Sequence, residues 1–387
     1  MTQAVAPPAT RALGAVAQAG MFVFGIVMAL VGAVVPSLSE QLSLTLGGVG
    51  TLFLAMNFAM LVASLVLGLV MDRFGLKPPL AIGAWLVAVG LVLIGSAERY
   101  TQLIPAVLAL GFGGGAINGA ANTLVADLHD DARRKAAALN LLGVFFGFGA
   151  LFLPFSLGAL AAAFGMPMLL YASSILCVLT GGAAAALPFP APKQRHGWPL
   201  GRMPQLLGMP IVLALAFLLF FQSGNEFTLG GYIGTFLTRE LHLSIEAASY
   251  GLAVYWAAIM ATRVVLSRLV LHVSPHAVVL GSALLSAGGA LVIAMSSTPA
   301  IAIAGVVLTG LALSGIFPTV LGIASARFHE NSGTVFGILF TVALSGGMTM
   351  PWVAGHLAEA SGVGAVFVLA AANFIAIAVL SAIASRT

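Results

Sequence analysis

A carboxyl, two amides and a guanidinium fall within apolar stretches of the sequence, where polar side chains are costly. Gln222, Asn225 and Glu226 lie in the stretch 208–238. On a helix Gln222 and Glu226 share one face, with Asn225 beside it. An ionised side chain in hydrocarbon costs about 2.5–3.5 kcal/mol on insertion scales, so such residues usually serve a function. Burial disfavours the charged form of a carboxyl. We therefore expect Glu226 to bind a ligand and to take up and release a proton.

Charge pairing is the alternative role for this carboxyl. Arg263, in the apolar stretch 247–271, is the only basic residue at a comparable depth. The two residues are expected on opposite sides of the middle of the bilayer, so a direct contact between them does not follow from the sequence. Both roles stay open, and Arg263 is a second candidate for proton coupling.

Other polar and aromatic side chains are candidates for lining a cavity. Asn118 and Asn122 are four residues apart and so share one helical face. An overlapping face carries a four-residue glycine repeat, Gly111, Gly115 and Gly119, which suits tight packing against a neighbouring helix. Tyr255 and Trp256 are candidates for stacking against a solute ring, although aromatic residues at helical spacing are more often core residues. Hydrogen bonds between helices explain three further asparagines at least as well as ligand binding: Asn57, Asn140 and Asn373.

The composition shows why hydrocarbon is the solvent to consider. Hydrophobic residues make up 60% of the 387 residues, charged residues 7%, and the mean hydropathy is +1.11. A soluble domain carries about 25% charged residues, so this chain is predicted to be an all-α, polytopic protein of the lipid bilayer. The net charge of +4 does not indicate nucleic-acid binding, because the basic residues fall mainly in the connections between apolar segments. The single cysteine, Cys177, excludes a disulfide within the chain.

Breaking the chain at charges, prolines and polar clusters gives twelve apolar segments, each near or above the ~20 residues needed to cross a bilayer. They are 13–37, 47–71, 78–97, 101–126, 136–164, 166–187, 208–238, 247–271, 274–296, 299–326, 332–358 and 362–385. Basic residues set the orientation, since they are enriched on the cytoplasmic side. With the N-terminus inside, twelve of the fifteen basic residues fall on the cytoplasmic side, Arg99 and Arg239 lie on the outer side, and Arg263 lies deep within a span. We therefore expect a multi-pass protein of the cell inner (plasma) membrane with both termini cytoplasmic.

The chain divides into two similar halves. Residues 188–207 form a proline-rich, basic connection, which we predict to be a cytoplasmic linker between an N-terminal six-helix bundle, 1–187, and a C-terminal one, 208–387. An internal repeat supports this division. Pro154, Gly158, Leu160 and Gly165 recur with the same spacing 197 positions later, as Pro351, Gly355, Leu357 and Gly362.

A charged loop lies between the second and third segments. It contains Gly68, Asp72, Arg73, Gly75 and Lys77 in the sequence GLVMDRFGLK. Gly75 permits a tight turn in this loop. This loop resembles the Gly-x-x-x-Asp-Arg-x-Gly-x-Lys motif of the major facilitator superfamily, in which these residues act in gating. The resemblance implies two pseudo-symmetric six-helix bundles around a central cavity that opens alternately to either side. It also implies that the first, fourth, seventh and tenth spans line that cavity.

Four stretches resemble the fucose–proton symporter branch of that superfamily: 138–154, 225–237, 255–269 and 315–328. The last contains Ile-Phe-Pro-Thr, and the resemblance makes Phe317 a candidate for contacting the substrate. Fucose transporters carry acidic residues in the first and fourth spans. Here the first span has none, and Asn118 stands at the fourth-span position. Coupling has then moved to Glu226, or the protein is a uniporter, or it transports something other than a hexose.

The sequence therefore predicts a secondary transporter, acting as a monomer on a small-molecule substrate and protons. Proton-coupled uptake of a sugar or polyol comes first, by resemblance. Proton-driven efflux of drugs or metabolites is the alternative, although the fifth span reads Leu-Pro where the antiporter motif has Gly-Pro. An enzyme is not expected, because the sequence contains no His-Glu-x-x-His, Gly-x-Ser-x-Gly or nucleotide-binding Gly-rich motif. Neither a cofactor nor a metal is expected.

Overall fold

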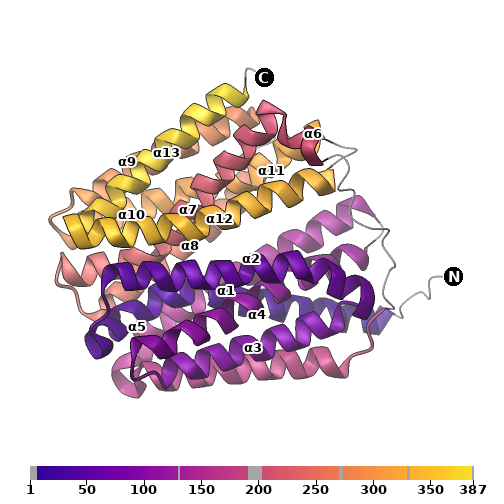
Figure 1. The fold of residues 1–387 in the computed structure, drawn as a ribbon, viewed down its shortest axis with the longest axis horizontal. Coiled ribbons are helices and arrows are strands. Elements are labelled where there is room, and N and C mark those ends of the chain that lie inside the picture. Colours follow the sequence, from indigo (N-terminus) through magenta and orange to yellow (C-terminus); the bar gives the residue numbers. More distant parts are fainter. Residues whose placement is uncertain (1–6, 130, 191–202, 270–272, 329–331, 386–387) are drawn as a thin grey trace. The chain divides into compact units, whose positions relative to one another are not determined.

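The computed structural model describes residues 7–129, 131–190, 203–269, 273–328 and 332–385, and over these ranges the chain is helical and contains no strand (Figure 1). The helices are α1 (Pro7–Leu42), α2 (Leu46–Phe74), α3 (Lys77–Gly95), α4 (Tyr100–Asp127), α5 (Ala132–Ala186), α6 (Met203–Leu207), α7 (Pro210–Arg239), α8 (Ile245–Leu269), α9 (Pro275–Ala294), α10 (Pro299–Leu313), α11 (Ile316–Arg327), α12 (Ser332–Ser361) and α13 (Gly364–Ala384). Most of the predicted linker lies outside the described ranges, and α6 forms its last residues.

Two irregular helices explain how these elements correspond to the predicted spans. Helix α5 contains the fifth and sixth spans, joined at Gly165, whose φ of 75° and ψ of 155° break the helical backbone. The tenth span is interrupted between Leu313 and Ile316 and forms α10 and α11. With α5 counted as two and α10 with α11 as one, the described helices longer than α6 correspond in order to the twelve predicted spans. Among the described residues, ten helices are long and apolar enough to cross a bilayer, with α5 counted once and α10 with α11 counted once. The all-α, polytopic membrane fold is confirmed.

The repeat seen in the sequence is also present in the backbone. Gly165 and Gly362 are equivalent repeat positions, and both have a positive φ, 75° and 85°, which glycine adopts without steric cost. A Cβ at Gly149 of α5 would meet a backbone carbonyl of α1, and a Cβ at Gly346 of α12 would meet one of α7. Since Gly346 lies 197 positions after Gly149, the two halves repeat the same close helix contact.

Contacts between residues divide the chain into two compact units. The first consists of Met1–Val31 and Ala55–His196, and the second of Gly32–Leu54 and Gly197–Thr387. The division within the linker lies inside the predicted connection 188–207. The turn between α1 and α2, with the helix ends that adjoin it, packs with the second unit, whereas the repeat in the sequence assigns it to the first half.

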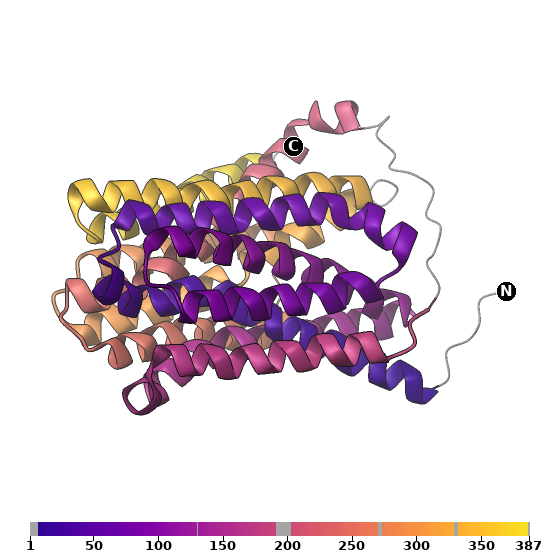
Figure 2. The same ribbon diagram turned by 60° about the horizontal axis from the view of Figure 1, so that its bottom comes forward.

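In the first unit, α3 packs against α4 and α5, and these helices lie side by side in two views (Figures 1 and 2). Helix α4 approaches α2 closely through Gly111, Gly115 and Gly119. A Cβ at Gly115 would lie 2.9 Å from the carbonyl oxygen of Met60. The expectation that this glycine repeat serves tight helix packing is confirmed.

In the second unit, α7 is the central helix and packs against α12 and α13. Helix α13 also packs against α9, which in turn contacts α10.

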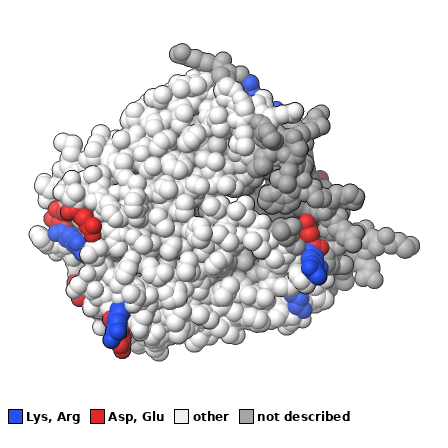
Figure 3. Space-filling view, viewed as in Figure 1, with Lys and Arg blue, Asp and Glu red and all other residues white. Residues whose placement is uncertain are grey.

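On the face drawn in Figure 3, the visible acidic and basic side chains lie near helix ends, and the surface along the helices is free of them. This distribution fits helices that run through hydrocarbon.

Candidate functional site

The candidate site in the second unit is built on the middle of α7. Proline at its first turn starts this helix, and packing against its neighbours buries most of its length. Gln222 is buried and Glu226 is half-buried on the same face. The Gln222 Nε2 donates a hydrogen bond to Glu226 Oε2 at 3.0 Å, and the Ser223 hydroxyl donates to Gln222 Oε1 at 3.4 Å. Gln222 and Glu226 therefore lie on one helical face, as predicted, and form a hydrogen-bonded pair.

Helix α8 adds a buried phenol to this pair. Tyr255 is fully buried, and its hydroxyl has no hydrogen-bond partner among the described residues. Its ring lies beside α7, because a Cβ at Gly230, four residues after Glu226, would be 3.9 Å from Tyr255 Cε1. Trp256 is buried beside Tyr255, and the two rings meet edge to face with their centroids 5.5 Å apart. Because unpaired buried polar groups are rare, the Tyr255 hydroxyl is available to a ligand or to the carboxyl.

Asn225 has a different environment from its neighbours on α7. It is fully buried, its Oδ1 accepts a hydrogen bond from Asn373 Nδ2 at 3.0 Å, and its Nδ2 donates to the Ala370 carbonyl oxygen at 3.1 Å. Asn373 and Ala370 both belong to α13. The amide of Asn225 thus joins two helices of the same unit, as expected of Asn373 from the sequence.

Asn118 and Asn122 form the polar feature of α4 in the first unit. The Nδ2 of Asn122 lies 3.0 Å from Asn118 Oδ1 and 2.8 Å from the Asn118 carbonyl oxygen. It also lies 3.9 Å from the sulfur of Met21 on α1. Both amides are half-buried. The structure therefore brings these two residues together on one helical face.

Two further predicted site residues, Phe317 and Arg263, belong to the second unit. Phe317 follows the break between α10 and α11 and stacks on Phe340 of α12, with ring centroids 6.0 Å apart. The side chain of Arg263 lies outside the described residues, so the structure leaves its pairing with Glu226 as a prediction. The same holds for the environment of Gly68, although its backbone lies in α2.

The charged loop between α2 and α3 has the turn that its glycine predicts. Gly75 has a φ of 80°, and its N–H donates to the Met71 carbonyl oxygen at 2.9 Å, ending α2. Asp72 is half-buried, and the guanidinium of Arg73 lies 5.3 Å from the centre of the Phe74 ring. Lys77 begins α3. The gating role of these residues stays a prediction.

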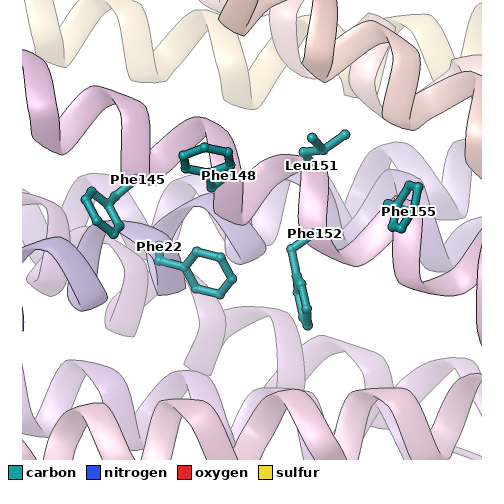
Figure 4. A pocket seen from close by; sticks show the side chains of 6 residues that line it. All are labelled: Phe22, Phe145, Phe148, Leu151, Phe152 and Phe155. Atoms are coloured by element: carbon teal, nitrogen blue, oxygen red, sulfur yellow. The ribbon is translucent and has the colours of Figure 1, made fainter.

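The first unit also contains an aromatic groove that was not predicted. Its volume is about 400 Å³, and Figure 4 shows its lining residues on α1 and α5. They are Phe22, Phe145, Phe148, Leu151, Phe152 and Phe155. The four α5 phenylalanines are spaced three, four and three residues apart, which places them on one helical face. That spacing was the signal in the sequence.

Known proteins match most of the chain. The family model for the Major Facilitator Superfamily matches residues 19–223 and 215–386. The MFS-type transporter YfkL of Bacillus subtilis (strain 168) is 23% identical over 371 residues, covering 90% of this chain and 89% of that protein. An MFS-type transporter of Yersinia pestis is 22% identical over 356 residues, covering 89% of each.

Solved transporter structures share the fold. A bacterial homolog of the human lysosomal transporter Spinster, inward-facing and unoccupied, superimposes with a TM-score of 0.82 at 14% identity, covering 99% of this chain and 98% of that one. The nucleoside transporter NupG gives 0.80 at 13% identity, covering 97% and 99%. The fucose:proton symporter FucP of E. coli gives 0.67 at 17% identity, covering 97% and 98%. The family predicted from the charged loop and the repeat is confirmed, and the chain belongs to the major facilitator superfamily.

Proposed function

We propose that this transporter moves a small hydroxyl-bearing solute, such as a sugar or polyol, by alternating access, and that Glu226 couples uptake to protons. The observation that carries the proposal is the cluster of Gln222, Glu226 and Tyr255. It combines, on two helices that pack against each other, a half-buried carboxyl and a buried phenol whose hydroxyl has no partner in the described residues.

The chemistry of the cluster suits a hydroxyl group. An ionised carboxylate accepts hydrogen bonds, whereas a phenol can both donate and accept. A solute hydroxyl can therefore donate to Glu226 and accept from Tyr255. When Glu226 takes up a proton, it loses acceptor capacity and the bond from Gln222 weakens. Protonation then changes how tightly the solute is held, which is the requirement for coupling.

The other predicted residues take supporting roles in this proposal. Within the first unit, Asn118 and Asn122 bind the solute. Within the second unit, Phe317 contacts the solute and Trp256 supports the Tyr255 ring. Asn225 anchors α7 to α13, because both ends of its amide are engaged there. Arg263 tunes the charge of Glu226 from α8, and the charged loop with Asp72 and Arg73 gates the side of the membrane that carries the termini. We place the termini in the cytoplasm and the monomer in the inner membrane.

A ligand screen on the purified protein tests the proposal. Hexoses, polyols and lipophilic cations are compared by thermal shift, since a ligand at 100 times its Kd stabilises the folded state by about 2.7 kcal/mol. We expect a hydroxyl-rich solute to stabilise the wild type, and to stabilise Glu226→Gln less at the same concentration because that variant binds the solute more weakly. Glu98→Gln, which changes an exposed carboxyl in the loop between α3 and α4, is the matched control and should respond as the wild type does.

Efflux of lipophilic solutes is the second candidate, and the aromatic groove of the first unit favours it. Its lining side chains are all apolar, so the groove suits a lipophilic solute rather than a sugar. Stabilisation by lipophilic cations alone, equal in wild type and Glu226→Gln, would select this function and reject the first.

A further inference from the structure

The turn between α1 and α2 is held at one end of the second unit. Residues 32–54 pack with that unit, although they belong by sequence to the first repeat. They include the last part of α1 and the first part of α2. Because α1 crosses the membrane, this turn lies on the side opposite the start of α1.

Tyr232 of α7 is the centre of this contact. It is fully buried, and its hydroxyl lies 3.2 Å from the carbonyl oxygen of Leu46 and 3.1 Å from that of Pro351. Leu46 is the first residue of α2, and Pro351 lies in α12. One phenolic proton is thus shared between the backbones of two helices, and α2, α7 and α12 meet at a single hydroxyl.

Two charged side chains hold the same turn nearer its surface. The Nη2 of Arg239, at the end of α7, donates to the Leu44 carbonyl oxygen at 3.3 Å. The carboxylate of Glu359, on α12, accepts hydrogen bonds from the Gly47 N–H and from the Thr45 hydroxyl. Glu359 therefore caps the first turn of α2 from another helix, where an acidic group is favoured by the helix dipole.

Glycines allow the backbones to come close enough for these bonds. A Cβ at Gly355 of α12 would meet the Leu46 carbonyl oxygen, and one at Gly50 of α2 would lie 2.8 Å from the Cα of Trp352. A Cβ at Gly32 of α1 would meet the Gly230 carbonyl oxygen of α7. The groups that these side chains contact are backbone carbonyls, a backbone N–H and a hydroxyl near the start of α2. Water can hydrogen-bond to all of them if the turn moves away from the second unit. Separation of the turn from α7 and α12 therefore leaves no charged group buried without a partner.

We propose that Tyr232, Arg239 and Glu359 form a latch that closes this end of the transporter, and that the latch opens whenever the cavity faces that side. The proposal rests on the alternating access proposed above. Tyr232 is a positioning residue in this account: it sets the balance between two conformations and does not touch the solute.

Distances between two spin labels test the latch without any solute. Cys177 is first replaced by serine, and labels are placed at Gln41→Cys and Ala360→Cys, both exposed and outside the latch. A shorter distance reports the closed latch and a longer one the open latch. In Tyr232→Phe, we expect the ratio of long to short distances to rise about two- to ten-fold, the value of one hydrogen bond. Glu359→Gln should change it in the same direction.

Tyr171→Phe is the matched control, because it removes the same atom from α5 in the first unit. It should leave the distance distribution as it is in the labelled parent. If Tyr232→Phe and Glu359→Gln both give the parental distribution, the latch is refuted. Because no ligand is needed, that result would leave the role of Glu226 untouched, and a failed ligand screen would leave this measurement valid.

Discussion

Asn225 allows the proposed division between anchoring and solute-binding residues to be measured. In Asn225→Ala, α7 loses both its bond from Asn373 and its bond to the Ala370 carbonyl oxygen. Hydrogen bonds between membrane helices average about 0.6 kcal/mol and reach about 1.7 kcal/mol. We therefore expect the free energy of unfolding to fall by about 1–3 kcal/mol. Asn373→Ala removes only the shared bond from this pair and should cost less.

A double-mutant cycle isolates the shared bond. Unfolding of the wild type, Asn225→Ala, Asn373→Ala and the double variant is followed by denaturant titration in mixed micelles. The coupling energy should be about 0.6–1.7 kcal/mol, and the KM for solute should stay at the wild-type value in Asn225→Ala. Effects that add to within about 0.3 kcal/mol, together with a raised KM, would refute the anchoring role and place Asn225 in the solute site.

Two further predictions concern the site and the packing. Tyr255→Phe removes a buried hydroxyl that has no partner in the described residues. We therefore expect unchanged or slightly higher thermal stability, together with a solute Kd raised about two- to ten-fold. Calorimetric titration measures the Kd, and lower stability with an unchanged Kd would contradict a solute-binding role for Tyr255. Gly149→Ala and Gly346→Ala would each place a Cβ against a backbone carbonyl, so both should lower the melting temperature. Gly288→Ala is the control, because a Cβ there meets nothing within 4 Å, and it should leave the melting temperature unchanged. Equal melting temperatures for all three variants would show that the close helix contacts do not contribute to stability.

The fold could be predicted because its determinants are local in the sequence. Charge depletion and segment length indicate membrane helices, and the matching positions of Gly165 and Gly362 revealed a repeat that the backbone shares through positive φ values. The glycine spacing on α4 likewise predicted a close contact, since a face without side chains needs a neighbouring helix to fill it. Gly75 predicted a turn for the same kind of reason.

The site was less predictable because its residues have partners that are distant in the sequence. The amide of Asn225 is explained by Asn373, 148 positions away, and no local pattern distinguishes an anchoring amide from one that binds a ligand. Tyr232 was overlooked because its two acceptors are backbone carbonyls, which leave no trace in residue types. The packing of residues 32–54 with the second unit depends on which conformation is more stable, and that is a property of the whole chain.

Proton movement during transport tests the central claim most directly. Protein is reconstituted into vesicles that contain a pH-sensitive dye, and the solute identified by the screen is added outside without an imposed pH gradient. If Glu226 is the coupling carboxyl, wild-type vesicles will acidify as solute enters, whereas Glu226→Gln vesicles will take up solute down its gradient with no change in internal pH. Equal acidification per solute in the two proteins would contradict the account.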